Sequence, residues 1–150
     1  IGDIGYAQSN RERYEGFCQA LTDAGKKVDS SLCLTTPLGI DTYREEIDTF
    51  LSSLSRMPDA FVCASDYVAC ILMQLLEKRG LRVPEDVAVS GFDNNTEDLL
   101  AEHLTTVQVF NEELGARLAL QILYRIKYPN TPHEITYLGT NVLYRDSTGD

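Results

Sequence analysis

The residues of this chain that could do chemistry are four polar side chains that lie at or soon after the end of a short apolar run. They are Arg13, Ser65, Asp66 and Asp93, and the polar residues Gln8, Ser9, Asn10 and Asn94 follow the same predicted strands. The carboxyl ends of parallel strands meet at one edge of a sheet, and ligands of open α/β folds bind there. A guanidinium and a carboxylate beside hydroxyl groups would suit a small polar ligand with several hydroxyls. The sequence therefore predicts a binding rim built from residues far apart in the chain.

Each of these residues also has a purely structural interpretation. Arg13 shares its helical turn with other charged residues and could simply be solvated. Asp66 could cap a helix by accepting from free backbone N–H groups, and Asp93 could accept from the amides of its own turn. Only their convergence on one edge favours the binding interpretation. Two histidines have no partner that the sequence can place, and we assign no role to either: His103 and His133.

The stretch from Pro58 to Asn94 must position three of the four residues. Residues 60–64 form an apolar run of strand length, and the polar residues after it can cap a helix that begins near Tyr67. That helix has a single strongly polar residue over its first ten positions, so we expect it to be buried on two sides. Gly80 can end it in the left-handed conformation. A second apolar run then completes a βαβ unit, which implies a parallel sheet.

The same alternation of strand and helix precedes that unit. The predicted elements are a strand at 1–6, a helix capped by Ser9 or Asn10 and ending near Asp23, a strand at 31–35, and a helix with a Thr42–Glu45 capping box that stops before Pro58. The two helices carry the apolar stripes Tyr14, Phe17, Cys18, Leu21 and Ile47, Phe50, Leu51, Leu54. Together with the βαβ unit, this order predicts half of a doubly wound α/β fold.

The alternation breaks after Asp93. We expect a loop or short helical turn at 94–103, a strand at 104–109, a helix capped by Asn111 that runs to about Lys127, and two short β-prone runs at 135–138 and 141–145. The last helix carries the stripe Leu114, Leu118, Ile122 and Ile126.

Composition excludes several classes of function. Thirteen basic against 23 acidic residues give a net charge of −10, which would repel a phosphate backbone, so we expect no binding of nucleic acid by this chain itself. No apolar run approaches the roughly 18 residues of a membrane span. The four cysteines lack the spacing of a zinc site or a redox motif, which favours buried thiols in a reducing cytoplasm. The chain begins inside a strand-like run, and we expect it to be a piece of a longer protein.

Several motifs in this order resemble the effector-binding core of the lactose/galactose repressor family of bacterial transcription regulators. They are P-D-A-F-V-C-A-S-D, G-L-R-V-P-E-D-V-A-V-S-G-F-D-N, L-T-T-V and the terminal Y-R-D-S-T-G. The resemblance covers nearly the whole chain but only the second half of that core. It implies a periplasmic-binding-protein-like fold with effector bound between two subdomains. Residues 1–103 and 129–150 would belong to the C-terminal subdomain, and 104–128 would be a crossover strand and helix of the other subdomain.

The resemblance also implies site roles. Arg13, in the pattern R-x-R-x-x-G-F, matches an arginine that grips effector hydroxyl or carboxylate groups, and Asp93 matches an acid that pairs with ring hydroxyls. Ser65 stands where the family has asparagine, beside Asp66, and this departure changes one expected effector contact. The Val109-Phe110 order is also unusual for the family. The resemblance thus predicts a sugar or related metabolite as effector without identifying it.

A homodimer interface is a further implication of the resemblance. Its candidate residues are Val68, Cys70, Ile71, Met73 and Leu99. The alternative is a helix merely sandwiched between the sheet and another helix. The segment 104–127 would lack the strands it packs on, so we expect it either to pack on a second copy of the chain or to be mobile. Its four large apolar side chains represent about 6–12 kcal/mol of burial.

The leading functional hypothesis is therefore the effector-sensing and dimerising part of a regulator that reaches operator DNA only through an N-terminal domain outside this chain. One alternative is the sugar- or solute-binding protein of a transporter, which shares the fold. A less favoured one is a flavodoxin-like enzyme or phosphoacceptor domain with Asp66 at a strand end. The chain lacks the acidic pair and lysine of a phosphoacceptor and the common nucleotide and nucleophile motifs. We therefore expect no enzymatic activity, no cofactor and no metal.

Overall fold

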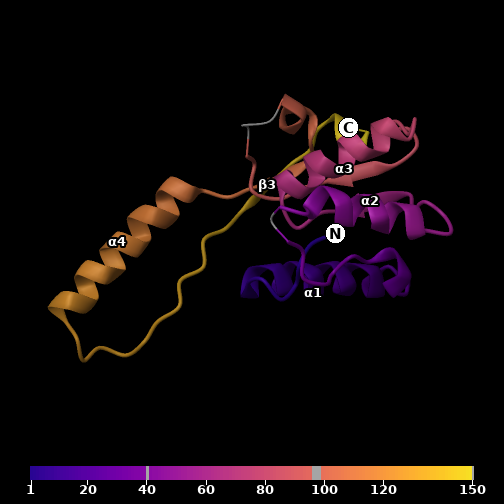
Figure 1. Cartoon of the computed structure of the whole chain (residues 1–150). Coiled ribbons are helices and arrows are strands. Elements are labelled where there is room, and N and C mark those ends of the chain that lie inside the picture. The colour runs from indigo at the N-terminus through magenta and orange to yellow at the C-terminus, as the bar shows by residue number, and fades with distance from the viewer. Residues whose placement is uncertain (40, 96–98, 150) are drawn as a thin grey trace.

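The computed structural model describes residues 1–39, 41–95 and 99–149, with the side chain of Leu99 outside the described part. The helices are α1 (Gln8–Asp23), α2 (Tyr43–Ser53), α3 (Asp66–Lys78) and α4 (Asn111–Lys127), and the strands are β1 (Ala60–Val62), β2 (Ala88–Ser90), β3 (Thr106–Gln108) and β4 (Asn141–Leu143). Three short 3₁₀ turns are η1 (Ser30–Leu32), η2 (Leu99–His103) and η3 (Asp146–Thr148). Helices α1, α2 and α3 lie together, whereas α4 projects away from them (Figure 1).

A parallel layer of backbone forms the centre of the body. β1 pairs with β2 in parallel, with Phe61 opposite Val89. On the far side of β2, Ser90 bridges Thr105, also in parallel. On the other side of β1, the backbone of Ile1 bonds to residues 62 and 64, and Gly2 donates to the Leu34 carbonyl oxygen at 2.9 Å. The spatial order is therefore 33–35, 1–4, β1, β2, β3, which is an order typical of doubly wound folds. The predicted fold class is confirmed.

Helix α3 is the most deeply buried element. Ser65 caps it by accepting from the Val68 amide at 3.4 Å, and Gly80 follows it with φ +74°, as predicted from the sequence. Eight of its thirteen residues are buried, and it contacts α2, β2 and η2. The prediction of a helix covered on two sides is confirmed. Ile47 and Leu51 of α2 join it in one apolar core with the β1 and β2 side chains.

Several local predictions are wrong, and short-range hydrogen bonds explain most of them. Asp3 accepts from the Gly5 amide at 2.7 Å, which turns the chain within the predicted strand 1–6. Asp29 accepts from the amide and hydroxyl of Ser31, which forms η1 where a strand was predicted. Thr42 bonds to the carboxylate of Glu46 rather than Glu45.

The remaining differences lie at helix starts and near the C-terminus. Helix α1 begins at Gln8 with Ala7 as N-cap, rather than Ser9 or Asn10. Helix α4 begins at Asn111 with Phe110 as N-cap, one residue before the predicted cap. Neither has a side-chain cap. Residues 135–138 form no strand, whereas β4 occupies part of the run at 141–145. The predicted helical turn is present as η2, and residues 96–98 lie outside the described part.

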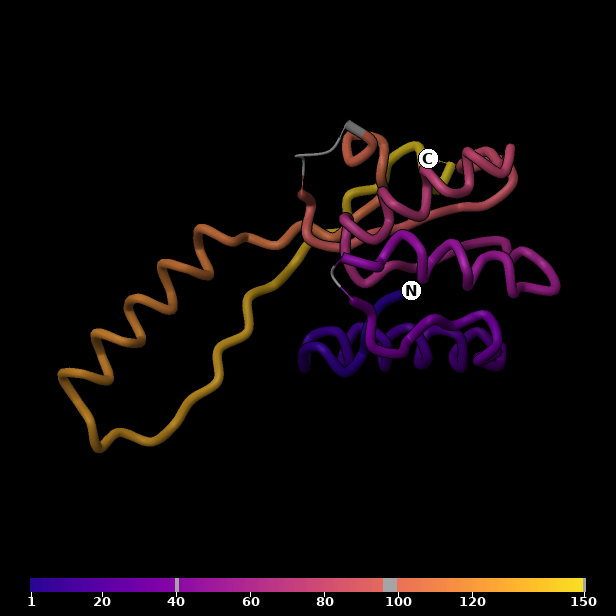
Figure 2. The backbone as a smooth tube through the Cα atoms, viewed as in Figure 1, coloured from indigo at the N-terminus to yellow at the C-terminus, as the bar shows by residue number. Residues whose placement is uncertain are grey.

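Helix α4 is connected to the body by a two-stranded antiparallel ribbon. β3 pairs with β4, Thr106 opposite Leu143, and the returning chain runs back beside the outgoing one (Figure 2). No residue described in α4 is buried. Its predicted stripe is between 48% and 73% exposed: Leu114, Leu118, Ile122 and Ile126. An apolar face of this width is the side on which a helix normally packs.

None of the helices in the described ranges has the length and apolarity needed to cross a bilayer.

Gly91 is required by its surroundings. A Cβ at this position would lie 2.2 Å from the Asp66 Oδ1 atom and 2.8 Å from the Leu104 Cδ2 atom. We expect Gly91→Ala to lower the free energy of unfolding by about 1–3 kcal/mol because the core cannot relax around the added methyl. Gly115→Ala is the matched control, since nothing lies within 4 Å of its Cβ position in α4. Urea denaturation measures both, and equal midpoints would contradict the packing.

The exposed stripe of α4 predicts weak protection of its amides. A 17-residue helix with no buried residue is marginal in water, so we expect protection factors of about ten or less in α4, against strong protection in α3. Hydrogen exchange followed by NMR, with the oligomeric state fixed by sedimentation, measures this. Full protection of α4 in a monomer would contradict it, whereas protection that appears with dimerisation would show that a second copy covers the stripe.

Candidate functional site

Arg13 and Asp93, predicted on separate elements, lie opposite each other at the carboxyl edge of the parallel layer. The Arg13 Nη2 atom is 3.8 Å from the Asp93 Oδ1 atom, and the two side chains are 27% and 42% exposed. Arg13 belongs to the second turn of α1, and Asp93 follows β2 by three residues. The pair is half-buried, so water only partly screens its attraction. The geometric prediction that these two residues share one rim is confirmed.

The guanidinium of Arg13 is fixed by two further contacts. Its Nη1 donates to the Ala64 carbonyl oxygen at 2.6 Å, just after β1. Its Cζ lies 3.6 Å from the centre of the Phe92 ring, a cation–π arrangement. These contacts join α1, β1 and the segment after β2 through one side chain. The group is thus presented in a set orientation at the rim, as polar recognition requires.

The acidic half of the rim has a special backbone. Asp93 has φ +112° and Asn94 has φ +54°, so two consecutive non-glycine residues have positive φ. Such conformations cost free energy and persist where neighbouring contacts impose them. The Asp93 amide donates to the Val107 carbonyl oxygen at 2.9 Å, and Asp93 bridges Gln108. The turn aims the Asp93 carboxylate back toward Arg13.

Asp66 lies behind this rim. The residue is 2% exposed, its Oδ1 accepts from the Thr106 hydroxyl at 2.6 Å, and its Oδ2 accepts from the Asn95 amide at 2.7 Å. Its own amide donates to the Phe92 carbonyl oxygen at 2.8 Å. The Asp66 Oδ2 atom therefore holds the segment that carries Asp93, and the Oδ1 atom holds the start of β3. Its assignment as an effector contact stays a prediction, and its contacts give it a positioning role. Ser65, half-buried, serves as the cap of α3.

Burial shifts the pKa values of the central pair. Burial raises the pKa of the Asp93 carboxyl above its usual range, Arg13 pulls it down, and the nearby Asp66 carboxylate raises it. Burial lowers the pKa of the Arg13 guanidinium, and Asp93 offsets part of that change. Desolvation thus exceeds the attraction at this separation, as expected for a pair at 3.8 Å without a direct hydrogen bond. A ligand that forms hydrogen bonds with both Arg13 and Asp93 would offset the desolvation of both charged groups.

A small apolar cavity of about 90 Å³ lies beneath α1, next to the rim. Tyr14 and Phe17 line it from α1, and Cys33 and Cys63 line it from the parallel layer. Burial raises the pKa of the Cys63 thiol to about 11, so this thiol stays protonated and unreactive near neutral pH. The four cysteines all lie in the described ranges and none forms a disulfide there; Cys63 and Cys70 are buried, and Cys18 and Cys33 are partly exposed. In the described ranges, no three His, Cys, Asp or Glu side chains form a group that could hold a metal.

The predicted dimer residues lie on α3 and at the start of η2. Val68, Cys70 and Ile71 are buried within the chain, and Met73 is partly buried against the same core. The side chain of Leu99 lies outside the described part. The packing of α3 against α2 and the sheet accounts for these side chains in one copy. Their role in a homodimer stays a prediction.

The chain matches a family model along almost its whole length. Residues 1–148 match the periplasmic binding protein-like domain. The chain belongs to this family. The implied fold is thereby confirmed, and so is the resemblance to lactose/galactose-type repressors, because the relatives found by sequence and by structure include regulators of that type.

Two curated relatives are bacterial regulators. The chain is 35% identical over 117 residues to the HTH-type transcriptional regulator DegA of Bacillus subtilis, covering 77% of this chain and 34% of that protein. It is 34% identical over 142 residues to the regulator CelR of Thermobifida fusca, covering 91% of this chain and 40% of that one. The chain thus spans well under half the length of these curated relatives.

Two solved structures superpose closely. A LacI-family transcriptional regulator from Sanguibacter keddieii has a TM-score of 0.79 at 30% identity, covering 92% of this chain and 52% of that one. A complex of the transcriptional regulator CelR with cellobiose has a TM-score of 0.80 at 31% identity, covering 91% and 42%. The fold comparison therefore agrees with the sequence comparison.

The sequence pointed to the two charged groups of the rim but missed the residues that hold them. The sequence motifs assign no role to Phe92, Thr106 or Arg145, and they predict Asn94 only as a further polar residue of the rim. The one available signal was the order Gly-Phe-Asp, which places an aromatic ring beside the acid. Their contacts cross up to 51 positions of sequence, which local patterns do not encode.

Arg13→Met should raise the pKa of Asp93 further, because it removes the nearby positive charge that lowers it. A carboxyl-carbon NMR titration measures this, and Arg11→Met, an exposed neighbour on the same helix, is the control. The pKa of Asp93 is higher in the folded than in the unfolded chain. The stabilisation that Asp93 gives to the folded state is therefore fully present below the unfolded pKa, and it is lost as pH rises through the folded pKa. Arg13→Met should make this loss of stability larger, because it raises the folded pKa further. An unchanged or lower pKa of Asp93 in Arg13→Met would contradict the pairing.

Proposed function

We propose that this chain is the effector-sensing part of a LacI-type transcriptional regulator and that the Arg13–Asp93 rim binds a saccharide effector. The observation that carries the proposal is the opposed guanidinium and carboxylate at the carboxyl edge of the sheet, 3.8 Å apart and both partly exposed. A carboxylate accepts from sugar hydroxyls and a guanidinium donates to them. The related regulator CelR is described in complex with cellobiose, and a LacI-family regulator from Lactobacillus casei with bound sucrose.

Residues 1–103 and 129–150 would form one subdomain, and 104–128 would be a crossover into a second. The exposed stripe of α4 supports this division, because a helix with such a face packs on something outside the described body. The chain would then contribute one wall of the effector cleft, with Arg13 and Asp93 on it. We expect its affinity for an effector to be weaker than that of a complete cleft.

The full protein would be a cytoplasmic homodimer that reaches operator DNA through a segment outside this chain. The net charge of −10 supports the separation of sensing from DNA binding. Val68, Cys70, Ile71, Met73 and Leu99 remain our candidates for the dimer interface. Effector binding would be coupled to DNA binding by about 1–3 kcal/mol, as in typical allosteric proteins. We infer no enzymatic activity, in line with relatives that are regulators.

Calorimetric titration and thermal shift with cellobiose, sucrose and other mono- and disaccharides test the saccharide assignment. We expect at least one sugar to raise the melting temperature of the chain. Arg13→Ala and Asp93→Ala should each weaken binding of that sugar about 10–100-fold, the usual cost of losing a charged hydrogen-bond partner.

Arg11→Ala is the matched control, because Arg11 is exposed two residues before Arg13 and should bind as the parent does. If both rim variants respond to the sugar as the parent does, the sugar binds elsewhere and the site assignment is wrong. If no saccharide in the panel binds the parent at millimolar concentration, the effector is of another class.

A further inference from the structure

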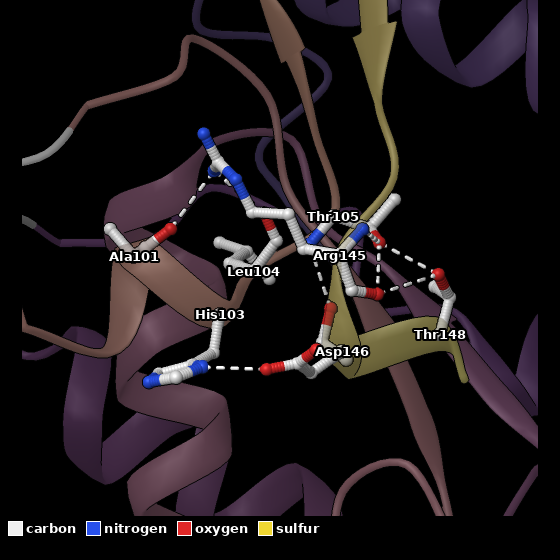
Figure 3. A network of polar contacts seen from close by, with 8 residues as sticks. Ala101, His103, Leu104, Thr105, Arg145, Asp146 and Thr148 are labelled. Atoms are coloured by element: carbon white, nitrogen blue, oxygen red, sulfur yellow. Dashed lines mark hydrogen bonds and ion pairs between the residues drawn. The ribbon is translucent and has the colours of Figure 1, made fainter. Parts of the chain in front are cut away.

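A group of polar contacts, here called the clasp, joins the C-terminal segment to the body. It consists of His103, Thr105, Arg145, Asp146 and Ser147 with the backbone atoms that they bind. Thr105 and Arg145 bind each other twice: the Arg145 amide donates to the Thr105 hydroxyl oxygen at 2.8 Å, and that hydroxyl donates to the Arg145 carbonyl oxygen at 3.0 Å. The buried Ser147 hydroxyl accepts from the Thr105 amide at 2.8 Å and donates to the Val89 carbonyl oxygen at 2.6 Å. Figure 3 shows the two contacts between Thr105 and Arg145 beside η3. The backbone of Arg145 is therefore fixed beside the end of β2.

The guanidinium of Arg145 extends from this clasp in two directions. Its Nη1 donates to the Ala101 and Leu104 carbonyl oxygens at 3.0 and 2.9 Å, and Figure 3 shows it reaching toward Ala101. Its Nη2 donates to the Asn94 Oδ1 atom at 2.7 Å. One planar, permanently charged group thus holds η2 and the residue next to Asp93 together.

Asn94 needs such a partner. It has φ +54°, directly after Asp93 with φ +112°. Its amide has only a long hydrogen bond, 3.3 Å to the Thr106 hydroxyl oxygen, whereas its side chain accepts the charge-assisted bond from Arg145. At the next residue, the Asp66 carboxylate accepts from the Asn95 amide at 2.7 Å. The turn at 93–95 is therefore held by two side chains, Asp66 of α3 and Arg145 of the C-terminal segment.

We propose that Arg145 is a positioning residue for Asp93. By holding the Asn94 side chain, it keeps the 93–95 turn in its left-handed form and the Asp93 carboxylate turned toward Arg13. Its effect on ligand affinity rests on the proposed function, whereas its effect on the turn does not. The contact with Asn94 separates this role from simple anchoring of the C-terminus, which needs only the bonds to Ala101, Leu104 and Thr105.

Amide hydrogen exchange of the 150-residue chain by NMR tests the proposal. The variants are Arg145→Met, which removes every donor of the guanidinium, and Asn94→Gly, which removes only the bond to Nη2 and accepts positive φ without strain. Asp146→Asn is the matched control, because it alters the exposed His103–Asp146 pair of the same clasp without touching Asn94.

We expect Arg145→Met and Asn94→Gly each to speed exchange of the 93–95 amides about tenfold, and the double variant to be no faster than Arg145→Met alone. Asp146→Asn should leave these amides at the parent rate. Faster exchange at 146–149 with parent rates at 93–95 in Arg145→Met would overturn the proposal. If Arg145→Met does not fold, Asn94→Gly decides alone, and parent rates at 93–95 in that variant overturn it.

Titration with cellobiose, or with whichever sugar of the panel binds the parent, tests the effect on the ligand. Arg145→Met should weaken that binding about tenfold, and parent-like affinity would overturn the link from Arg145 to the ligand. If no sugar binds the parent while the 93–95 amides respond as expected, the saccharide assignment fails and the positioning role stands.

Discussion

The buried carboxylate of Asp66 is the constraint on which the rim of this protein depends. A carboxylate removed from water must be matched by donors, and here the donors are the Thr106 hydroxyl and the Asn95 amide. Leaving such groups unpaired would cost about 1–3 kcal/mol each. The start of α3, the turn after β2 and the start of β3 are therefore held together by one side chain. Gly91 lets them approach, since any Cβ there would collide with Asp66.

Arg13 connects the first helix to the same edge of the sheet. α1 contributes no buried residue, and its aromatic face covers a small cavity rather than filling the core. The guanidinium contacts to the Ala64 carbonyl oxygen and the Phe92 ring are thus among the interactions that fix the start of α1 against the sheet. Residues that would bind a ligand also hold the elements in place, so the rim is preorganised rather than assembled by the ligand.

Local patterns in the sequence predicted the elements with strong apolar periodicity and clear stop signals. The βαβ unit around α3, with Ser65 before it and Gly80 after it, is the best example. The strands predicted at 1–6 and 31–35 were wrong because the side chains of Asp3 and Asp29 accept hydrogen bonds that turn the chain. The spacing of apolar residues alone does not detect such turns.

At the site, parallel topology was enough to bring Arg13 and Asp93 together. It could not reveal that Asp66 is buried, that Phe92 stacks on the guanidinium, or that Arg145 reaches Asn94. Those facts depend on side-chain orientation and on contacts between distant segments.

The ribbon of β3 and β4 has a mechanical consequence. A single strand can swivel about its backbone torsions, whereas two hydrogen-bonded strands resist torsion and pass it on. Asp93 is bridged to Gln108 on β3, and Gln108 is paired with Asn141 on β4. The backbone that carries the acidic group and the ribbon that leads to α4 are therefore joined by a continuous series of paired residues.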